Sequence, residues 1–249
     1  MYTLFKKEVN SFLNSLIGYI SIILFLLIMG PFLWGIPFFF SPPAPYGILT
    51  YGYAEMKGFF LLAPLIFLLL IPAITMRSFA EEEKSGTIEL LMTQPLSDLQ
   101  IILAKYLAGV FLVIFSLLPT FIYFFSVYRL GLPPGNLDTG GIWGSYIGLF
   151  FIGISFVAIG VFISSLTDSQ ILSFIITIFL SFFIFKGFEL VNTYIISGTA
   201  GIIIESLGIN AHYESMSRGV IDTRDLIYFI SINAFFLLLT KVSLESRKW

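Results

Sequence analysis

Residues 142–164 read IWGSYIGLFFIGISFVAIGVFIS, a run that contains no Asp, Glu, Lys or Arg. An α-helix rises about 1.5 Å per residue, so roughly 20 apolar residues are needed to cross the hydrocarbon core of a bilayer. This run is therefore long enough to be a membrane-spanning helix. Similar apolar windows occur on both sides of it, and the six predicted spans are 17–38, 58–76, 104–128, 142–164, 171–190 and 226–243.

The composition of the whole chain is that of a membrane protein. Hydrophobic residues make up 57% of the 249 residues and charged residues 11%, whereas ordinary soluble domains carry roughly 25% charged residues. A water-soluble fold of this size could not hide so much apolar surface from solvent. We therefore predict an all-α membrane protein with a single domain over residues 1–249, embedded in the lipid bilayer.

The distribution of basic residues predicts the orientation, because short cytoplasmic loops are enriched in Lys and Arg. An even number of spans places both termini on the same side, and the positive bias favours the cytoplasm for both. We therefore expect a multi-pass protein of a bacterial inner membrane. The basic residues on the predicted cytoplasmic side are Lys6, Lys7, Arg77, Lys84, Lys105, Lys241, Arg247 and Lys248, whereas Lys57, Arg129, Lys186, Arg218 and Arg224 lie outside.

Two segments next to the spans have amphipathic patterns. Residues 3–16 predict a helix that lies in the cytoplasmic interface, with the alternative of a frayed start to the first span. Its apolar face comprises Leu4, Phe5, Val9, Phe12, Leu13 and Leu16. Near the other end of the chain, 200–207 is apolar apart from Glu205 and too short to span. It predicts a re-entrant helix packed beneath a 212–225 loop, with an interfacial helix on the outer leaflet as the alternative.

The largest predicted cytoplasmic loop covers residues 77–105. An acidic cluster, 81–83, precedes Gly86, and an amphipathic turn over 88–93 is then stopped by Pro95. Ser97 and Gln100 have the spacing of a capping box, so a new helix should begin there and continue into the third span. This pattern predicts a structured protrusion; the alternative is a solvated loop whose acidic residues only aid solubility.

Motifs of catalysis and of metal or nucleic-acid binding are missing from the sequence. There is no G-x-x-x-x-G-K-[ST] phosphate loop, no H-E-x-x-H and no G-x-S-x-G, and the chain has no Cys and a single His. No Lys/Arg stripe indicates nucleic-acid binding. We therefore expect neither an enzyme nor a metal site, and no cofactor bound by this chain.

The fifth predicted span carries a hydroxyl stripe, Ser173, Thr177 and Ser181, which repeats every four residues. These side chains could line a substrate path. Alternatively, they could hydrogen-bond to their own helix backbone and pack against neighbouring helices, and this is the interpretation we favour.

The loop sequence 76–95, MRSFAEEEKSGTIELLMTQP, with Ser97 and Lys105 after it, resembles the cytoplasmic loop of ABC-2-type transporter permeases. The segment 212–229, HYESMSRGVIDTRDLIYF, and the closing run 239–249 resemble the same family. Together with six spans and an amphipathic start, the resemblance covers essentially the whole chain.

The resemblance implies a division of labour between subunits. A separate ATPase subunit would bind ATP and Mg²⁺, and the N-terminal helix would be an elbow at the membrane surface. The second permease would be another copy of this chain or a different membrane subunit, and a large envelope-facing subunit is a further candidate partner. On this chain the resemblance places the ATPase-docking coupling helix at Glu81, Glu82, Glu83, Gly86, Thr87, Ile88 and Glu89. Ser173, Thr177 and Ser181 would be candidates for the path, and Ile203 and Glu205 for its outer gate.

Overall fold

The computed structural model describes residues 1–36, 47–93, 95–194 and 199–246. Within these ranges the regular structure is helical, and six helical segments are long and apolar enough to cross a membrane. The predicted all-α membrane fold with six spans is thus confirmed. The six segments are α2 (Leu16–Trp34), α4 with α5 (Lys57–Lys84), α7 with α8 (Asp98–Leu130), α9 (Thr139–Ser164), α10 with α11 (Gln170–Thr193) and α14 (Thr223–Ser246).

Three of these segments are interrupted within the described chain. A turn separates α4 (Lys57–Thr75) from α5 (Ala80–Lys84), and a 3-10 turn separates α7 (Asp98–Leu117) from α8 (Phe121–Leu130). A π-helical segment, Phe183–Gly187, lies between α10 (Gln170–Phe182) and α11 (Phe188–Tyr194). The shorter helices are α1 (Tyr2–Leu13), α3 (Ile48–Tyr51), α6 (Ile88–Met92), α12 (Thr199–Glu205) and α13 (Ile209–Ser217).

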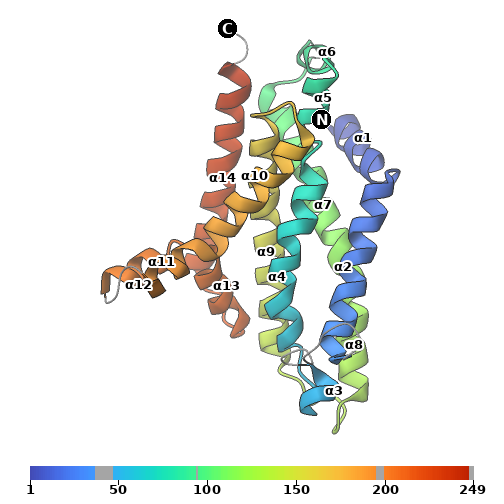
Figure 1. The fold of residues 1–249 in the computed structure, drawn as a ribbon, viewed down its shortest axis with the longest axis vertical. Helices are drawn as coiled ribbons and strands as arrows, with labels where there is room; N and C mark the ends of the chain where they lie inside the picture. The colour runs from blue at the N-terminus through green and yellow to red at the C-terminus, as the bar shows by residue number, and fades with distance from the viewer. Residues whose placement is uncertain (37–46, 94, 195–198, 247–249) are drawn as a thin grey trace.

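The two ends of the bundle differ. In Figure 1, α1, α5, α6 and the C-terminal end of α14 lie together at the top, whereas α3 and the end of α8 lie at the bottom. The N-terminal helix, the loop helices and the end of the last span therefore share one end of the molecule. We call it the α5–α6 end.

Helix α9 is the centre of the bundle. It packs against α4, α7, α10, α13 and α14, and 72% of its most apolar window is buried. Small residues permit these close approaches. A Cβ at Gly144 would lie 2.2 Å from the carbonyl oxygen of Met216, and one at Gly160 would lie 2.0 Å from Thr75 Oγ1. Gly144 therefore allows α13 to pack directly against the start of α9, and Gly160 allows α4 to pack near its end.

The N-terminal helix α1 is a separate element, and not a frayed start to α2. It packs against α7, and its buried side chains are Leu4 and Val9. The predicted helix over 3–16 is too long, because Ser15 Oγ accepts a hydrogen bond from Gly18 N at 3.0 Å and caps α2. Leu16, predicted on the apolar face of α1, instead begins α2 and is 75% exposed.

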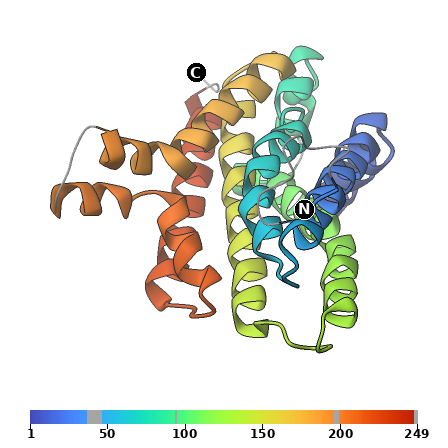
Figure 2. The same cartoon turned by 60° about the horizontal axis from the view of Figure 1, so that its bottom comes forward.

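The segment after α10 forms a lateral hairpin. Helices α11 and α12 pack against each other and project to the side of the bundle, as both ribbon views show (Figure 1 and Figure 2). The prediction of a loop over 212–225 is wrong, because α13 continues to Ser217 and α14 begins at Thr223. His212 joins these helices, since its ring nitrogens lie 2.7 Å from Asp225 Oδ1 and 2.9 Å from the Ser206 carbonyl oxygen.

Candidate functional site

The segment between α4 and α7, which we call the loop, contains two short helices, α5 and α6, joined at Gly86. The backbone of Gly86 has a φ of +70°, a conformation that glycine adopts far more readily than other residues. A Cβ added there would meet nothing within 4 Å, so conformation and not space explains the glycine. The hydroxyls of Ser85 and Thr87 lie 2.8 Å apart and close the same turn.

The far side of the loop is fixed by the predicted capping box, which the structure confirms. Gln100 N donates to Ser97 Oγ at 3.4 Å, and Ser97 N donates to Gln100 Oε1 at 3.1 Å. The loop therefore enters α7 through a capped helix end.

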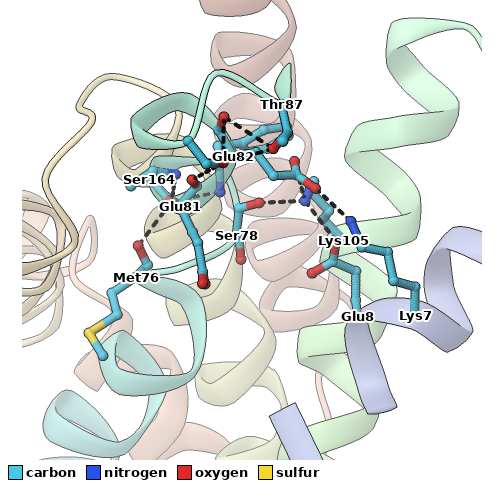
Figure 3. A network of polar contacts seen from close by, with 12 residues as sticks. Lys7, Glu8, Met76, Ser78, Glu81, Glu82, Thr87, Lys105 and Ser164 are labelled. Atoms are coloured by element: carbon cyan, nitrogen blue, oxygen red, sulfur yellow. Dashed lines mark hydrogen bonds and ion pairs between the residues drawn. The ribbon is translucent and has the colours of Figure 1, made fainter. Parts of the chain in front are cut away.

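The start of α5 is held by a side chain from α9. Ser164 Oγ accepts hydrogen bonds from the backbone N–H groups of Phe79 and Ala80 at 2.9 and 3.1 Å, and it donates to the Met76 carbonyl oxygen at 3.3 Å (Figure 3). The first N–H groups of a helix have no partner within the helix. Ser164 supplies that partner and ties the loop to the central helix.

A buried ion-pair cluster joins the loop to α1 and α7. The side chain of Lys105 on α7 is only 1% exposed, and its Nζ lies 2.8 Å from Glu8 Oε1 on α1 and 2.9 Å from Glu82 Oε2 on α5. The same ammonium donates to the Ser78 carbonyl oxygen. Lys7 Nζ lies 3.0 Å from Glu82 Oε1, on the more exposed side of the cluster (Figure 3). A buried ammonium is costly unless it is paired and hydrogen-bonded, and here it is both.

The charge of Lys7 supports the same cluster. Partial burial by itself would lower the pKa of the Lys7 ammonium, but the hydrogen bond to Glu82 and the nearby carboxylates outweigh it and raise this pKa above its ordinary value. Because the pKa of Lys7 is higher in the folded than in the unfolded state, its charge stabilises the folded state at every pH below the unfolded pKa. That stabilisation is lost only as the pH rises through the folded pKa. Lys7 therefore remains charged and paired across the neutral range.

The structure separates the predicted docking residues into two groups. Gly86, Thr87 and Glu89 are exposed at the tip of the loop, and Glu81 is exposed nearer its base, beside the cleft lined by Arg77 and Ser78. Glu82 is 9% exposed and forms ion pairs with Lys7 and Lys105. It therefore holds the loop against the bundle and is not part of the exposed tip. The two remaining residues, Glu83 and Ile88, are half-buried, and Ile88 packs on the hydrophobic core.

Sequence reasoning missed the residues that hold the loop in place. The sequence assigns no role to Ser164 and Glu8, and Lys105 enters only as a cytoplasmic basic residue and as part of the family pattern. Their partners lie far away in sequence, 97 residues in the case of Glu8 and Lys105. Lys105 alone carried a signal, because a lysine within an apolar helix needs a partner.

The predicted path-lining stripe faces into the bundle. Ser173, Thr177 and Ser181 are each 0% exposed on α10, which packs against α4 and α9. Thr177 Oγ1 donates to the Ser173 carbonyl oxygen at 2.7 Å, whereas Ser173 Oγ and Ser181 Oγ are buried without a hydrogen-bond partner. The expected hydrogen bond to the helix backbone is thus present at Thr177 alone of the three. The opposite face of α10 is apolar and exposed, with Phe179 71% exposed.

The two gate candidates lie on the lateral hairpin. Ile203 on α12 is 62% exposed, and Glu205 Oε2 accepts a hydrogen bond from Asn192 Nδ2 on α11 at 2.5 Å. The structure thus brings Glu205 into the hairpin interior and leaves Ile203 on its outside, away from the docking residues at the α5–α6 end.

Comparison with known proteins gives one match. A family model described as ABC-2 family transporter protein matches residues 2–243. No curated protein matches the chain significantly.

Proposed function

Because the chain belongs to the ABC-2 family of transporter proteins and is thus a multi-pass permease subunit of an ABC transporter, we propose that a separate ATPase subunit docks on α5 and α6. ATP hydrolysis on that subunit drives the permease. The tip of the loop, Gly86, Thr87 and Glu89, makes the contact, and Glu82 positions it from behind.

The observation that carries this proposal is the anchoring of α5, which carries the exposed tip, to three other helices, α1, α7 and α9. Lys105, Glu8 and Glu82 join α7, α1 and α5 through ion pairs of 2.8 and 2.9 Å, and Ser164 adds α9. Switching transitions move such elements as rigid bodies, because packed interfaces have discrete arrangements. A displacement of the tip therefore reaches α1 and α7 without being absorbed by a flexible linker.

The orientation that we propose in the membrane rests on the basic residues at the α5–α6 end. Both the N-terminal helix and the end of α14 lie at the α5–α6 end, which also carries the larger set of basic residues, among them Lys6, Lys7 and Lys84. Under the positive-inside rule this end faces the cytoplasm. The membrane is then a bacterial inner membrane, and the ATPase has access to the tip.

The biological setting that we propose is gliding motility or export to the cell envelope. We base this setting on a resemblance of the sequence to the permease subunit of the gliding-motility-associated ABC transporter, while the loop 76–95 and the C-terminal segment 212–229 carry the resemblance to the ABC-2 family. Two alternatives are a platform that moves proteins without transporting a solute, and a permease for metal-site maturation of a periplasmic enzyme. Neighbouring genes for an ATPase and a large envelope protein would favour the first setting.

Copurification tests the docking proposal. The tagged chain, extracted from native membranes in mild detergent, should retain a subunit that contains a G-x-x-x-x-G-K-[ST] motif. Glu89→Lys reverses a charge on the exposed tip and should release that subunit. Glu245→Lys, an exposed acid on α14 at the same end, is the matched control and should retain it. Retention by both variants, or no such subunit with the wild type, would overturn the proposal.

A further inference from the structure

A cleft of about 280 Å³ lies between α1, α7 and the turn that joins α4 to α5. Its apolar wall includes Phe12 on α1, Ile74 on α4 and Leu112 on α7. Most of the rest of its lining is polar and includes Arg77 and Glu81. The cleft is therefore amphipathic, with one side suited to hydrocarbon and the other to a charged group.

Ionic pairing inside the cleft leaves two groups available. Glu8 and Glu82 are neutralised by Lys105 and Lys7 at 2.8 to 3.0 Å. Among the residues that the structure describes, the Nε of Arg77 is buried without a hydrogen-bond partner. Glu81 is exposed, and Figure 3 shows its carboxylate directed away from the Lys105 cluster. The cleft thus offers one cation and one anion to a ligand.

A buried guanidinium nitrogen without a partner is costly, because its desolvation is not compensated. Phosphate is a ligand that fits a guanidinium well, since the planar fork donates parallel hydrogen bonds to its oxygens. A simple anion would nevertheless leave Glu81 facing a negative charge. A zwitterionic headgroup satisfies both groups, with its phosphate at Arg77 and its ammonium at Glu81.

We propose that this cleft binds a phospholipid with a primary-ammonium headgroup, of the phosphatidylethanolamine type, from the leaflet at the α5–α6 end. Its glycerol and first acyl carbons lie along the wall formed by Phe12, Ile74 and Leu112. The amphipathic helix α1, whose apolar residues Leu4 and Val9 face inward, forms the outer side of the cleft at the membrane surface. The lipid then joins the elbow helix to the base of the loop. This inference does not depend on ATPase docking.

Native mass spectrometry of the full-length protein tests the proposal. The purified chain is exchanged against vesicles of phosphatidylethanolamine or of phosphatidylglycerol before ionisation. The wild type should retain one phosphatidylethanolamine per chain in preference to phosphatidylglycerol. Arg77→Gln should weaken retention by about tenfold or more, since a hydrogen bond to a charged group is worth roughly 1.5–3 kcal/mol. Arg218→Gln, the same change at the residue that follows α13 and lies outside the cleft lining, should retain the lipid as the wild type does.

A second variant separates the headgroup assignment from folding. Glu81→Gln removes the partner of the ammonium and should shift the preference toward phosphatidylglycerol, even if Arg77→Gln does not fold. Equal retention of both lipids by the wild type would overturn the proposal. So would lipid retention by Arg77→Gln at the wild-type level, or displacement of the lipid by millimolar inorganic phosphate.

Discussion

At the residue scale, Lys105 determines how the loop is held. Its ammonium contacts carboxylates on two other helices and is within cation–π distance, 4.9 Å, of the Phe79 ring. The two carboxylates come from α1 and α5, which are also joined directly by the ion pair of Lys7 and Glu82 at 3.0 Å. Lys105 therefore adds the buried contact that ties both the N-terminal helix and the loop to α7.

Substitution of Lys105 should destabilise the protein strongly. Lys105→Met leaves Glu8 and Glu82 without their central partner, and breaking a buried ion pair costs about 3–5 kcal/mol. Lys241→Met removes a more exposed partner, 3.4 Å from Glu245 on the same helix, and should cost about 1 kcal/mol or less. Thermal unfolding in detergent compares the two variants. Equal unfolding temperatures would mean that the buried cluster does not hold the loop.

The acidic cluster 81–83 shows how much of the site the sequence could predict. Its location in a structured protrusion and the capping box at Ser97 are confirmed, because both depend on local spacing. Three adjacent glutamates are chemically identical in the sequence. Only the packing of α1 and α7 assigns Glu82 to the interior and leaves Glu81 exposed. A charge reversal of all three would therefore combine loss of docking with loss of the Lys105 cluster.

At the element scale, the turn between α5 and α6 depends on Gly86. Proline fixes φ near −65° and cannot adopt +70°, so Gly86→Pro should rearrange the tip while leaving the spans folded. Gly52→Pro is the matched control, because Gly52 has a φ of +72° and equally open surroundings at the opposite end. Loss of coupling should lower the ATP-dependent activity of the purified complex roughly 5–150-fold for Gly86→Pro only. Equal effects of the two variants would contradict a docking role.

The fifth span is predicted over 171–190, and the structure has a span-length helical segment over Gln170–Thr193. The apolar window gives no sign of the π-helical segment at Phe183–Gly187, which precedes α11. Such insertions are a recognised cause of helix bends. The hairpin of α11 and α12 then leaves the bundle, a direction that the apolar residues of 171–190 and 200–207 do not specify.

The hairpin gives the gate hypothesis a concrete test. Its interior is polar, with Asn192 bonded to Glu205, whereas Ile203 points outward and is 62% exposed. If the hairpin closes the path between two permease subunits, a spin label at Ile203 should lie close to the same label on the partner permease. A label that reports only headgroup-level lipid contact, without proximity to the partner, would leave a surface helix and exclude the gate.

At the scale of the whole molecule, two features could be predicted from the sequence: the number of spans, and the position of the first and last helices at the same end of the bundle. Hydrophobic length alone defines six spans, because backbone groups in lipid must be satisfied within each helix. The order in which the spans pack could not be predicted, since several are apolar on all sides. The central place of α9 depends on close contacts of Gly144 and Gly160 with distant residues.

Single cysteines test the orientation directly, because the native chain has none. Ser85→Cys at the α5–α6 end and Asn136→Cys at the opposite end both replace exposed residues. In intact cells an impermeant thiol reagent that reaches the periplasm should label Asn136→Cys only. After the membrane is made permeable, both should react. Labelling of Ser85→Cys in intact cells would reverse the orientation.

The central claim is that a separate ATPase contacts the tip of the loop, and site-specific photo-crosslinking in living cells tests it most directly. A photoreactive amino acid at Glu89, on the exposed side of α6, should form a covalent adduct with a subunit that contains a Walker motif. The same amino acid at Asn136 should not. An adduct with that subunit from Asn136, or none from Glu89 while the subunit is present, would contradict the account.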